Sequence, residues 1–292
     1  MNFQQFVVMI KEKTEFLLEE DTSVRIHTTL KNNGRIRTGL TISEEHVKIF
    51  PTIYLEEYYQ QFLKGCSVDV IAESIVDIYR GVDFERVQQA NSIKDLETIR
   101  HKIVYKVIHT ERNRKLLQTL PHIPYLDLSI VFYILFDVDE TGIATVPIAY
   151  NLMNLWEIDL ETLYDIARKN TPQLLPASFQ PMHVVVEELT GITPKEFPEK
   201  DILFVLSNSL RNFGACCILY DNVLLQIGEQ LGESFYILPS SIHEVIIVPE
   251  SECPTEKDLN EMIYEINQTQ MDLEEVLSDR VYRYDYKQRR LL

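Results

Sequence analysis

A turn signal near the N-terminus constrains the fold of this chain more than any other feature. Asn32-Asn33-Gly34 separates two alternating runs of β-prone residues, 24–30 and 36–42. Asn and Gly tolerate the positive φ angles of a tight turn, so this pattern predicts an antiparallel hairpin. Apolar residues recur at helical spacing over 2–18 and over 68–79, which predicts an amphipathic helix on either side of the hairpin.

Two further hairpins are expected, over 126–149 and over 202–219, the second turning at Asn212-Phe213-Gly214. Helical patterns lie between and after them. The sequence therefore predicts an α+β protein of short antiparallel sheets built from hairpins, with helices packed on one side.

Short sequence patterns predict one further strand and the ends of two helices. Residues 47–50 are expected to add a third strand to the first hairpin. Asp159 is expected to cap a helix that Pro172 ends. Thr255 and Asp258 resemble a capping box at the start of a later helix.

The domain organisation is suggested by a polar stretch without apolar period, residues 81–100, which is the best candidate linker. We expect an N-terminal helix-plus-hairpin module over 1–90 and a main α+β region over 91–292. Within that region, 144–152 and 215–223 are similar in sequence. This similarity is either a hairpin–helix duplication or a common local shape.

The chain is strongly acidic. Lys plus Arg is 28 and Asp plus Glu is 45, so the net charge is −17. Such a balance argues against direct binding to nucleic acid. No Lys or Arg occurs between Lys115 and Arg168 or between Arg211 and Lys257. These regions are either solvated surface or an acidic face for a basic protein partner. The apolar runs are too short to cross a membrane.

The sequence gives no support for secretion, for a disulfide framework, or for a phosphate-binding or metal-binding site. The N-terminus lacks the basic and apolar stretches of a secretory signal, and the four cysteines form no CxxC pair. A reduced, cytoplasmic protein is the simplest interpretation. There is no glycine-rich phosphate loop and no metal-ligand spacing, so no cofactor is expected.

One segment has a pattern typical of catalysis. Asp137 and Asp139 follow an apolar run in a DxDxT pattern, which resembles the first motif of haloacid-dehalogenase-type phosphatases. Ser207, at the end of a later apolar run, resembles the second motif. In that family the two aspartates are nucleophile and acid/base around magnesium. The required lysine is missing, because no Lys lies between Lys200 and Lys257.

A second polar segment is interpreted as structural. Ser241 and His243 lack a third partner for nucleophilic catalysis. A buried Glu244 would need a basic partner, since an unpaired buried carboxylate is costly. Arg280 or Arg283, from the basic C-terminal segment, is expected to form this internal clamp.

Four segments carry a family resemblance: 51–58, 170–177, 212–220 and 236–245, which read PTIYLEEY, NTPQLLPA, NFGACCILY and YILPSSIHEV. With them the chain resembles an uncharacterised bacterial family of Lachnospiraceae and related clostridia, domain-of-unknown-function family 5688. The stretch 156–170 more weakly resembles another uncharacterised Firmicutes family. The resemblance implies a cytoplasmic bacterial protein and no particular reaction, cofactor or partner.

Three functions remain open. The leading hypothesis is a non-enzymatic binding protein that recognises a protein partner through its acidic surface. The second is an acidic mimic of DNA that binds a DNA-handling protein. The third is the magnesium-dependent phosphatase with Asp137, Asp139 and Ser207. The oligomeric state has no signal in the sequence.

Overall fold

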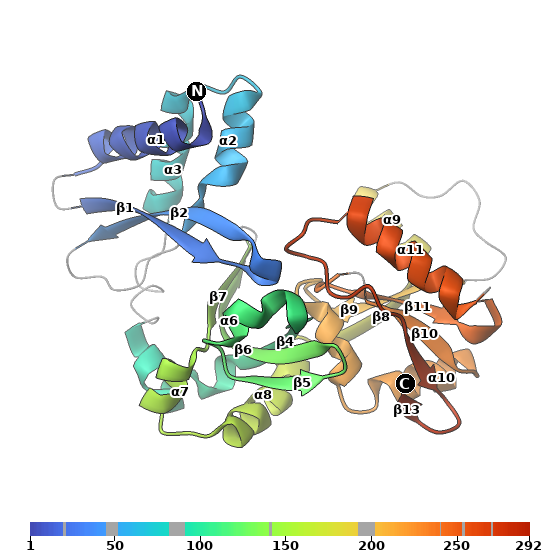
Figure 1. The fold of residues 1–292 in the computed structure, drawn as a ribbon. Helices are drawn as coiled ribbons and strands as arrows, with labels where there is room; N and C mark the ends of the chain where they lie inside the picture. Colours follow the sequence, from blue (N-terminus) through green and yellow to red (C-terminus); the bar gives the residue numbers. More distant parts are fainter. Residues whose placement is uncertain are drawn as a thin grey trace. The chain divides into compact units, whose positions relative to one another are not determined.

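A computed structural model of the chain describes residues 1–19, 22–44, 52–81, 91–139, 142–191, 202–239, 241–252, 255–269 and 271–292. These residues form two compact units, Met1–Ile99 and Arg100–Leu292, which we call the N-terminal unit and the C-terminal unit (Figure 1). The predicted boundary after residue 90 lies at the end of residues 82–90, outside the described residues. None of the described helices is long and apolar enough to cross a membrane.

The N-terminal unit is a three-stranded antiparallel sheet in the order β1-β2-β3, with α1, α2 and α3 on one face (Figure 1). Its elements are α1 (Phe3–Leu17), β1 (Thr22–Leu30), the 3-10 turn η1 (Asn32–Gly34), β2 (Ile36–Glu44), β3 (Ile53–Tyr54), α2 (Leu55–Leu63), α3 (Val68–Arg80), η2 (Asn91–Lys94) and α5 (Leu96–Ile99). The predicted hairpin and its flanking helices are confirmed.

The hairpin turn has the predicted geometry. Asn33 and Gly34 have φ angles of 55° and 75°. The backbone N–H of Lys31 donates to the carbonyl of Arg35 at 2.7 Å, which closes the turn. The third strand is β3, because its residues pair with β2. The predicted strand over 47–50 lies outside the described residues.

One apolar core fills the space between sheet and helices of this unit. It consists of Phe6, Ile10, Val24, Leu40, Ile42, Leu55, Ile71, Ile75 and Tyr79. These residues come from α1, both long strands, α2 and α3, so each element contributes its apolar face to the same core.

The C-terminal unit contains two antiparallel sheets. The four-stranded sheet is built around β6, which pairs with β4 along one edge and with β5 and then β7 along the other. Its strands are β4 (Ile103–His109), β5 (His122–Tyr125), β6 (Leu128–Asp139) and β7 (Gly142–Pro147). Its helices are η3 (Arg100–Lys102), η4 (Glu111–Asn113), α6 (Arg114–Leu117), α7 (Tyr150–Leu155) and α8 (Leu160–Leu174). The hairpin predicted over 126–149 is confirmed as β6 and β7.

The six-stranded sheet has the order β13-β12-β10-β11-β9-β8. Its strands are β8 (Ala177–Pro181), β9 (Phe204–Asn208), β10 (Phe235–Leu238), β11 (Val245–Pro249), β12 (Tyr282–Asp285) and β13 (Arg290–Leu291). Its helices are α9 (Met182–Thr190), η5 (Gly214–Leu219), α10 (Val223–Leu231), η6 (Glu250–Glu252) and α11 (Glu256–Thr269). Leu259 and Ile263 of α11 pack against Leu238, Val248 and Val281.

The predicted helix starts hold, whereas one predicted helix end is wrong. Asp159 caps α8 by accepting the backbone N–H of Thr162 at 2.8 Å. Thr255 Oγ1 likewise accepts the backbone N–H of Asp258, at 3.1 Å, before α11. Pro172 does not end α8, which continues to Leu174. A proline within the last turn removes only one intrahelical hydrogen bond, so the helix tolerates it there.

The strand predicted over 215–219, and with it the hairpin predicted over 202–219, are also wrong. This segment is η5, a 3-10 helix whose residues 214–218 are all buried. β9 pairs instead with β8 and β11. An unbroken apolar run does not distinguish a strand from another buried conformation. The segments 144–152 and 215–223 therefore differ in structure, and the proposed duplication keeps only its sequence support.

Candidate functional site

The residues of the phosphatase hypothesis belong to different sheets. Asp137 and Asp139 lie on β6, where their backbones pair with Ala144 and Gly142; their side chains are outside the described part of the structure. Ser207 lies on β9 of the six-stranded sheet and is buried. Its hydroxyl donates to the carbonyl of His243 at 2.7 Å, so it is already engaged.

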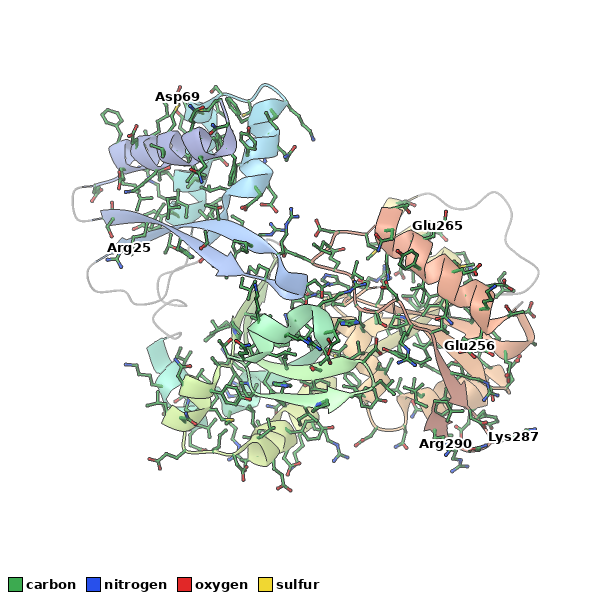
Figure 2. The ribbon with its side chains drawn as sticks, in the orientation of Figure 1. Arg25, Asp69, Glu256, Glu265, Lys287 and Arg290 are labelled. Atoms are coloured by element: carbon green, nitrogen blue, oxygen red, sulfur yellow. The ribbon has the colours of Figure 1, made fainter. Side chains whose placement is uncertain are left out.

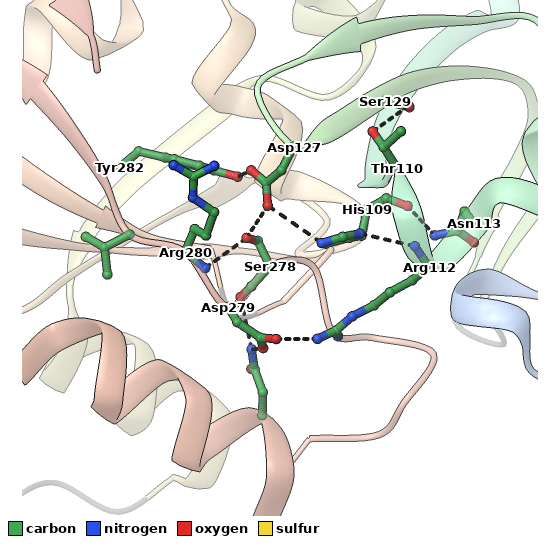
Figure 3. A network of polar contacts seen from close by, with 12 residues as sticks. His109, Thr110, Arg112, Asn113, Asp127, Ser129, Ser278, Asp279, Arg280 and Tyr282 are labelled. Carbon is green, nitrogen blue, oxygen red and sulfur yellow. Dashed lines mark hydrogen bonds and ion pairs between the residues drawn. The ribbon is translucent and has the colours of Figure 1, made fainter. Parts of the chain in front are cut away.

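A buried polar network connects the four-stranded sheet to the segment before β12 (Figure 3). Its centre is Asp127, in the turn between β5 and β6. Asp127 Oδ2 accepts the hydroxyl of Ser278 at 2.6 Å, and Asp127 Oδ1 accepts the hydroxyl of Tyr282 at 2.5 Å. His109 Nε2 lies 3.7 Å from Asp127 Oδ2. Ser278 is fully buried, so its hydroxyl depends on these protein partners.

Ser278, His109 and Asp127 have the composition of a catalytic triad but not its geometry. In a triad the serine donates to the imidazole, and the imidazole donates to the carboxylate. Here Ser278 donates directly to Asp127, and its oxygen accepts the backbone N–H of Arg280 at 3.0 Å. Since its hydroxyl donates to a carboxylate and not to the imidazole, and the side chain is fully buried, Ser278 lacks the arrangement of a triad nucleophile.

The neighbours of His109 select one tautomer of its neutral imidazole. Its Nδ1 accepts the backbone N–H of Arg112 at 3.3 Å, which places the proton on Nε2, toward Asp127. Burial lowers the pKa of His109, against the attraction of Asp127. Arg112 also pairs with Asp279 at 2.5 Å, adding a second link to the same segment. The network is therefore suited to packing two parts of the unit together.

A second cluster lies around Phe213 and His243. His243 Nδ1 accepts the backbone N–H of Phe213 at 3.3 Å, so Nε2 carries the proton and lies 3.9 Å from Glu275 Oε1. The Phe213 ring stacks on the imidazole, and Lys106 Nζ lies 3.8 Å from the centre of the Phe213 ring. Burial and the charge of Lys106 lower the pKa of His243. With Nδ1 occupied, this histidine has no free nitrogen to act as a base.

The cysteines of this region are equally inert. Cys216 and Cys217 are fully buried. The thiol of Cys217 donates to the carbonyl of Ser207 at 3.1 Å, and burial raises its pKa. A thiol held in the neutral form is a poor nucleophile. Within the described residues, no group of three or more His, Cys, Asp or Glu side chains is placed to hold a metal ion.

The basic C-terminal segment forms a clamp, but its acidic partner is Glu250. Arg283 Nε and Nη2 donate to the two oxygens of Glu250 at 2.9 and 3.1 Å, a bidentate pair. Arg280 is exposed. Glu244 is partly buried, which raises its pKa, and the charge that lowers it again comes from Arg211. Arg211, in the loop before η5, pairs with Glu188 and acts on Glu244 only through its nearby charge.

An acidic surface lies on α11, which bears Glu256 and Glu265 (Figure 2). Between residues 244 and 279 the chain has eleven Asp or Glu and one Lys, Lys257. Leu259 and Ile263 are buried beneath the helix, so the opposite face is exposed. That face, which we call the α11 surface, consists of Asp258, Glu261, Met262, Tyr264 and Glu265.

The α11 surface combines negative charge with exposed apolar area. Tyr264 and Met262 are 57% and 48% exposed. A shallow groove of about 550 Å³ lies beside Tyr264, lined by Glu256, Lys257, Asn260, Glu261, Tyr264 and Asp279. Lys257 pairs with Glu261 at 3.5 Å. One lysine leaves most of the charge uncompensated.

Comparison with known proteins places the chain in a family. Residues 3–286 match the family described as "Family of unknown function (DUF5688)". The chain belongs to DUF5688. No curated protein and no solved structure gives a significant match to it.

The DUF5688 resemblance in the sequence rested on four segments, three of which meet in the C-terminal unit. The segment 212–220 contacts 236–245 where Ala215 N–H donates to the carbonyl of Ile242 at 3.3 Å. It contacts 170–177 where the hydroxyl of Tyr220 donates to the carbonyl of Leu175 at 2.9 Å. These segments form buried backbone contacts, so this part of the family pattern is explained by packing.

Sequence reasoning missed the residues of the Asp127 network. Asp127 and Ser278 are 151 positions apart, and neither stands in a motif. The α11 surface, in contrast, had a signal. Its three carboxylates, Asp258, Glu261 and Glu265, follow helical spacing opposite the apolar Leu259 and Ile263.

Proposed function

We propose that this DUF5688 protein is a non-enzymatic binding protein that recognises a basic protein partner through the α11 surface. The observation that carries this proposal is the exposure of Tyr264 and Met262 beside the carboxylates of α11. Aromatic and methionine side chains are enriched where proteins bind each other, and charges of one sign around them select partners of the opposite sign.

The arrangement has a cost that binding would explain. Asp258, Glu261 and Glu265 lie on one stripe of α11, where like charges destabilise a helix by about 0.2–0.5 kcal/mol per pair. Only Lys257 on the same helix offsets them. A basic partner would relieve this repulsion.

The proposal also agrees with the state of the polar side chains. Ser207 and Ser278 donate to a carbonyl and a carboxylate, and Cys217 donates to a carbonyl. None of these three groups donates to a histidine imidazole, the usual base of a serine or cysteine nucleophile. The described residues thus present a recognition surface more readily than a reaction centre.

Site-specific photo-crosslinking in the native cell tests this function. A benzophenone amino acid replaces Tyr264 on α11 in one variant and Phe16 on α1 in the matched control. Phe16 is 88% exposed, so both probes are accessible. We expect crosslinks to a partner with a basic surface from position 264 and not from position 16. Equal crosslinking from both positions, or none from 264, would contradict the proposal.

The DNA-mimic hypothesis makes a further demand on the same partner. If α11 imitates phosphates, a DNA duplex should compete with the protein for the purified partner that crosslinking identifies. A partner that remains bound in excess duplex does not use its DNA-binding site for this protein, which would contradict the DNA-mimic hypothesis.

A further inference from the structure

The sheet of the N-terminal unit has two faces, of which only one contributes to the apolar core. β1 and β2 pair residue for residue along their whole length, so their side chains alternate strictly between the two faces. Val24, Leu40 and Ile42 belong to the core under α1, α2 and α3. The residues that alternate with them lie on the opposite side, which we call the outer sheet face.

The outer sheet face is basic and polar. Arg25 lies opposite Thr41 in the register, and Figure 2 shows Arg25 on the side of the hairpin away from α1. Lys31 follows β1 directly, and its backbone N–H donates to Arg35, so the alternation continues to it. The face consists of Arg25, His27, Lys31, Arg37, Thr41 and Tyr54, and the other residues of β1 and β2 on this side are Ser, Thr or Gly.

An imidazole ring lies in the middle of this face. Gly39 pairs with His27 on one side and with Tyr54 on the other. A Cβ added at Gly39 would lie 2.4 Å from Thr52 Cγ2 and 3.0 Å from His27 Nε2. Only a residue without a side chain leaves this space, so glycine allows the His27 ring to lie across the sheet, where His27 is exposed.

Two cations lie at the turn end of the same face. Lys31 Nζ is 4.3 Å and Arg37 Cζ is 5.6 Å from the centre of the Tyr54 ring. Arg37 also pairs with Glu57. Lys31 and Arg25, in contrast, make no ion pair with residues that the structure describes. Their positive charge is therefore available to an anionic partner.

The residue types of the outer sheet face select among the possible anionic partners. Arg, Lys, Ser, Thr and Tyr side chains are those that bind the phosphates and sugars of nucleic acids, and His is among the rings on which unstacked bases stack. Protein interfaces have an apolar centre, and membrane-binding surfaces present apolar side chains. The described residues of this face include no Val, Leu, Ile or Met.

We propose that the outer sheet face binds single-stranded nucleic acid, with Arg25 and Lys31 on phosphates and the His27 ring beneath a base. The strand would follow β1, along which these three residues extend over about 20 Å. A duplex fits less well. Its major groove admits a free two-stranded ribbon, whereas one side of this hairpin is covered by helices (Figure 1). This inference does not depend on the α11 surface.

The acidic composition of the chain does not oppose this local interaction. The net charge of −17 predicts poor binding of nucleic acid by the chain as a whole. Salt, however, screens exposed charges beyond about 8 Å at physiological ionic strength. A polyanion on the outer sheet face therefore responds mainly to residues 22–43, which contain four Lys or Arg and no Asp or Glu.

Fluorescence anisotropy of labelled oligonucleotides with the full chain tests this proposal. Arg25→Gln/Lys31→Gln removes the two cations that lack ion pairs. Lys64→Gln/Arg80→Gln, which removes two exposed cations at the ends of α2 and α3, is the matched control. We expect the first variant to bind a single strand roughly tenfold more weakly than the wild type, for any base sequence, and the control to bind like the wild type.

The salt dependence gives a second measure of the same contacts. Each phosphate contact contributes about −0.7 to the slope of log affinity against log salt on single strands. The slope of Arg25→Gln/Lys31→Gln should therefore be shallower than that of the wild type by about 1.4. His27→Ala should weaken binding roughly fivefold or more through the lost stacking. RNA and DNA forms of one sequence show which sugar is preferred, and binding of either supports the proposal.

Circular dichroism verifies the fold of each variant, and Thr41→Glu, opposite Arg25, serves where the double substitution disturbs it. The proposal is overturned if no single strand binds at about 0.1 mM protein in low salt, since even non-specific binding is tighter than this. Equal losses in the Arg25/Lys31 variant and the control also overturn it. Tighter binding of a duplex, or equally tight binding of poly-glutamate, would assign the face to another partner, and the proposal fails.

Discussion

The N-terminal unit and the C-terminal unit are stabilised in different ways. A single apolar core joins the sheet and the helices of the N-terminal unit, and its ion pairs, such as Lys13–Asp69, lie at the surface. The C-terminal unit also buries large apolar side chains, such as Tyr105, Phe132 and Phe235, and in addition Asp127 with its hydroxyl partners connects its segments. Burial of apolar area dominates the stability of the N-terminal unit. The stability of the C-terminal unit also depends on hydrogen bonds to all of its buried polar groups.

This contrast shows which charged residues can change without loss of the fold of either unit. In the N-terminal unit, exposed charged residues such as Arg25 and Arg35 contribute little to the core, so their sign can vary without loss of the fold. In the C-terminal unit, carboxylates divide into two roles. Asp127 is part of the interior, and those of α11 face solvent.

Removing core volume from the N-terminal unit should have the largest effect. Phe6 is fully buried and contacts the rings of Tyr59 and Phe62. Phe6→Ala should destabilise this unit by about 3–5 kcal/mol through lost burial and the cavity left behind. Hydrogen exchange followed by mass spectrometry measures the loss unit by unit. A loss of protection shared equally by both units would break the comparison, because it would mean that they unfold together.

Removing the central carboxylate of the C-terminal unit should follow in size. Asp127→Ala leaves the hydroxyls of Ser278 and Tyr282 without their acceptor, at about 1–3 kcal/mol for each buried group. Tyr282→Phe removes one donor only and should cost about 1–2 kcal/mol. Chemical denaturation of the three proteins gives these differences. An Asp127→Ala protein as stable as Tyr282→Phe would argue against two shared hydrogen bonds.

Acid should weaken the C-terminal unit through His109. Its folded pKa is lowered by burial, so the folded state binds fewer protons than the unfolded state. The stability it contributes is therefore complete above the unfolded pKa of about 6.5 and is lost as pH falls through the lowered folded pKa. The charges facing it are Asp127, Arg112, Asp279 and Glu111. Melting temperatures between about pH 7.5 and pH 5.5 should fall less in His109→Gln than in the wild type. Parallel slopes in the two proteins would exclude this role.

The smallest effect should come from the C-terminal clamp. Arg283→Met breaks the bidentate pair with Glu250, which is partly exposed, and should cost about 0.2–1 kcal/mol. Arg280→Met, at an exposed position of the same segment, is the control and should leave the melting temperature unchanged. If both variants melt alike, the ion pair contributes nothing measurable.

Local signals in the sequence predicted local structure well. Asn32-Asn33-Gly34 predicted its turn, and Asp159 and Thr255 predicted their helix starts, because each depends on neighbours within a few residues. β12 was missed although its signal was present. Tyr282 and Tyr284 are buried and alternate with Arg283 and Asp285, a period of two that the charges of the segment obscured.

Structure that depends on distant residues could not be predicted in this way. Gly214 has no room for a side chain, since an added Cβ would lie 2.2 Å from Ser207 Oγ and 2.7 Å from the carbonyl of His243. Nothing around Gly214 in the sequence indicates this close approach, and the segment that was predicted as a strand is η5. The α11 surface was foreseen only as an excess of acidic residues, because its exposed face depends on how the helix packs.

The separation of Asp127 from its partners also has a consequence for the order of folding. Ser278 and Tyr282 follow Asp127 by 151 and 155 residues, whereas β1 and β2 are joined by a short turn. Contacts between nearby residues close at a small loss of chain entropy, and distant ones close late. During synthesis the hairpin can therefore form while Asp127 still has water as its only partner. In kinetic experiments, Asp127→Ala should leave the refolding rate of the C-terminal unit close to wild type and accelerate its unfolding.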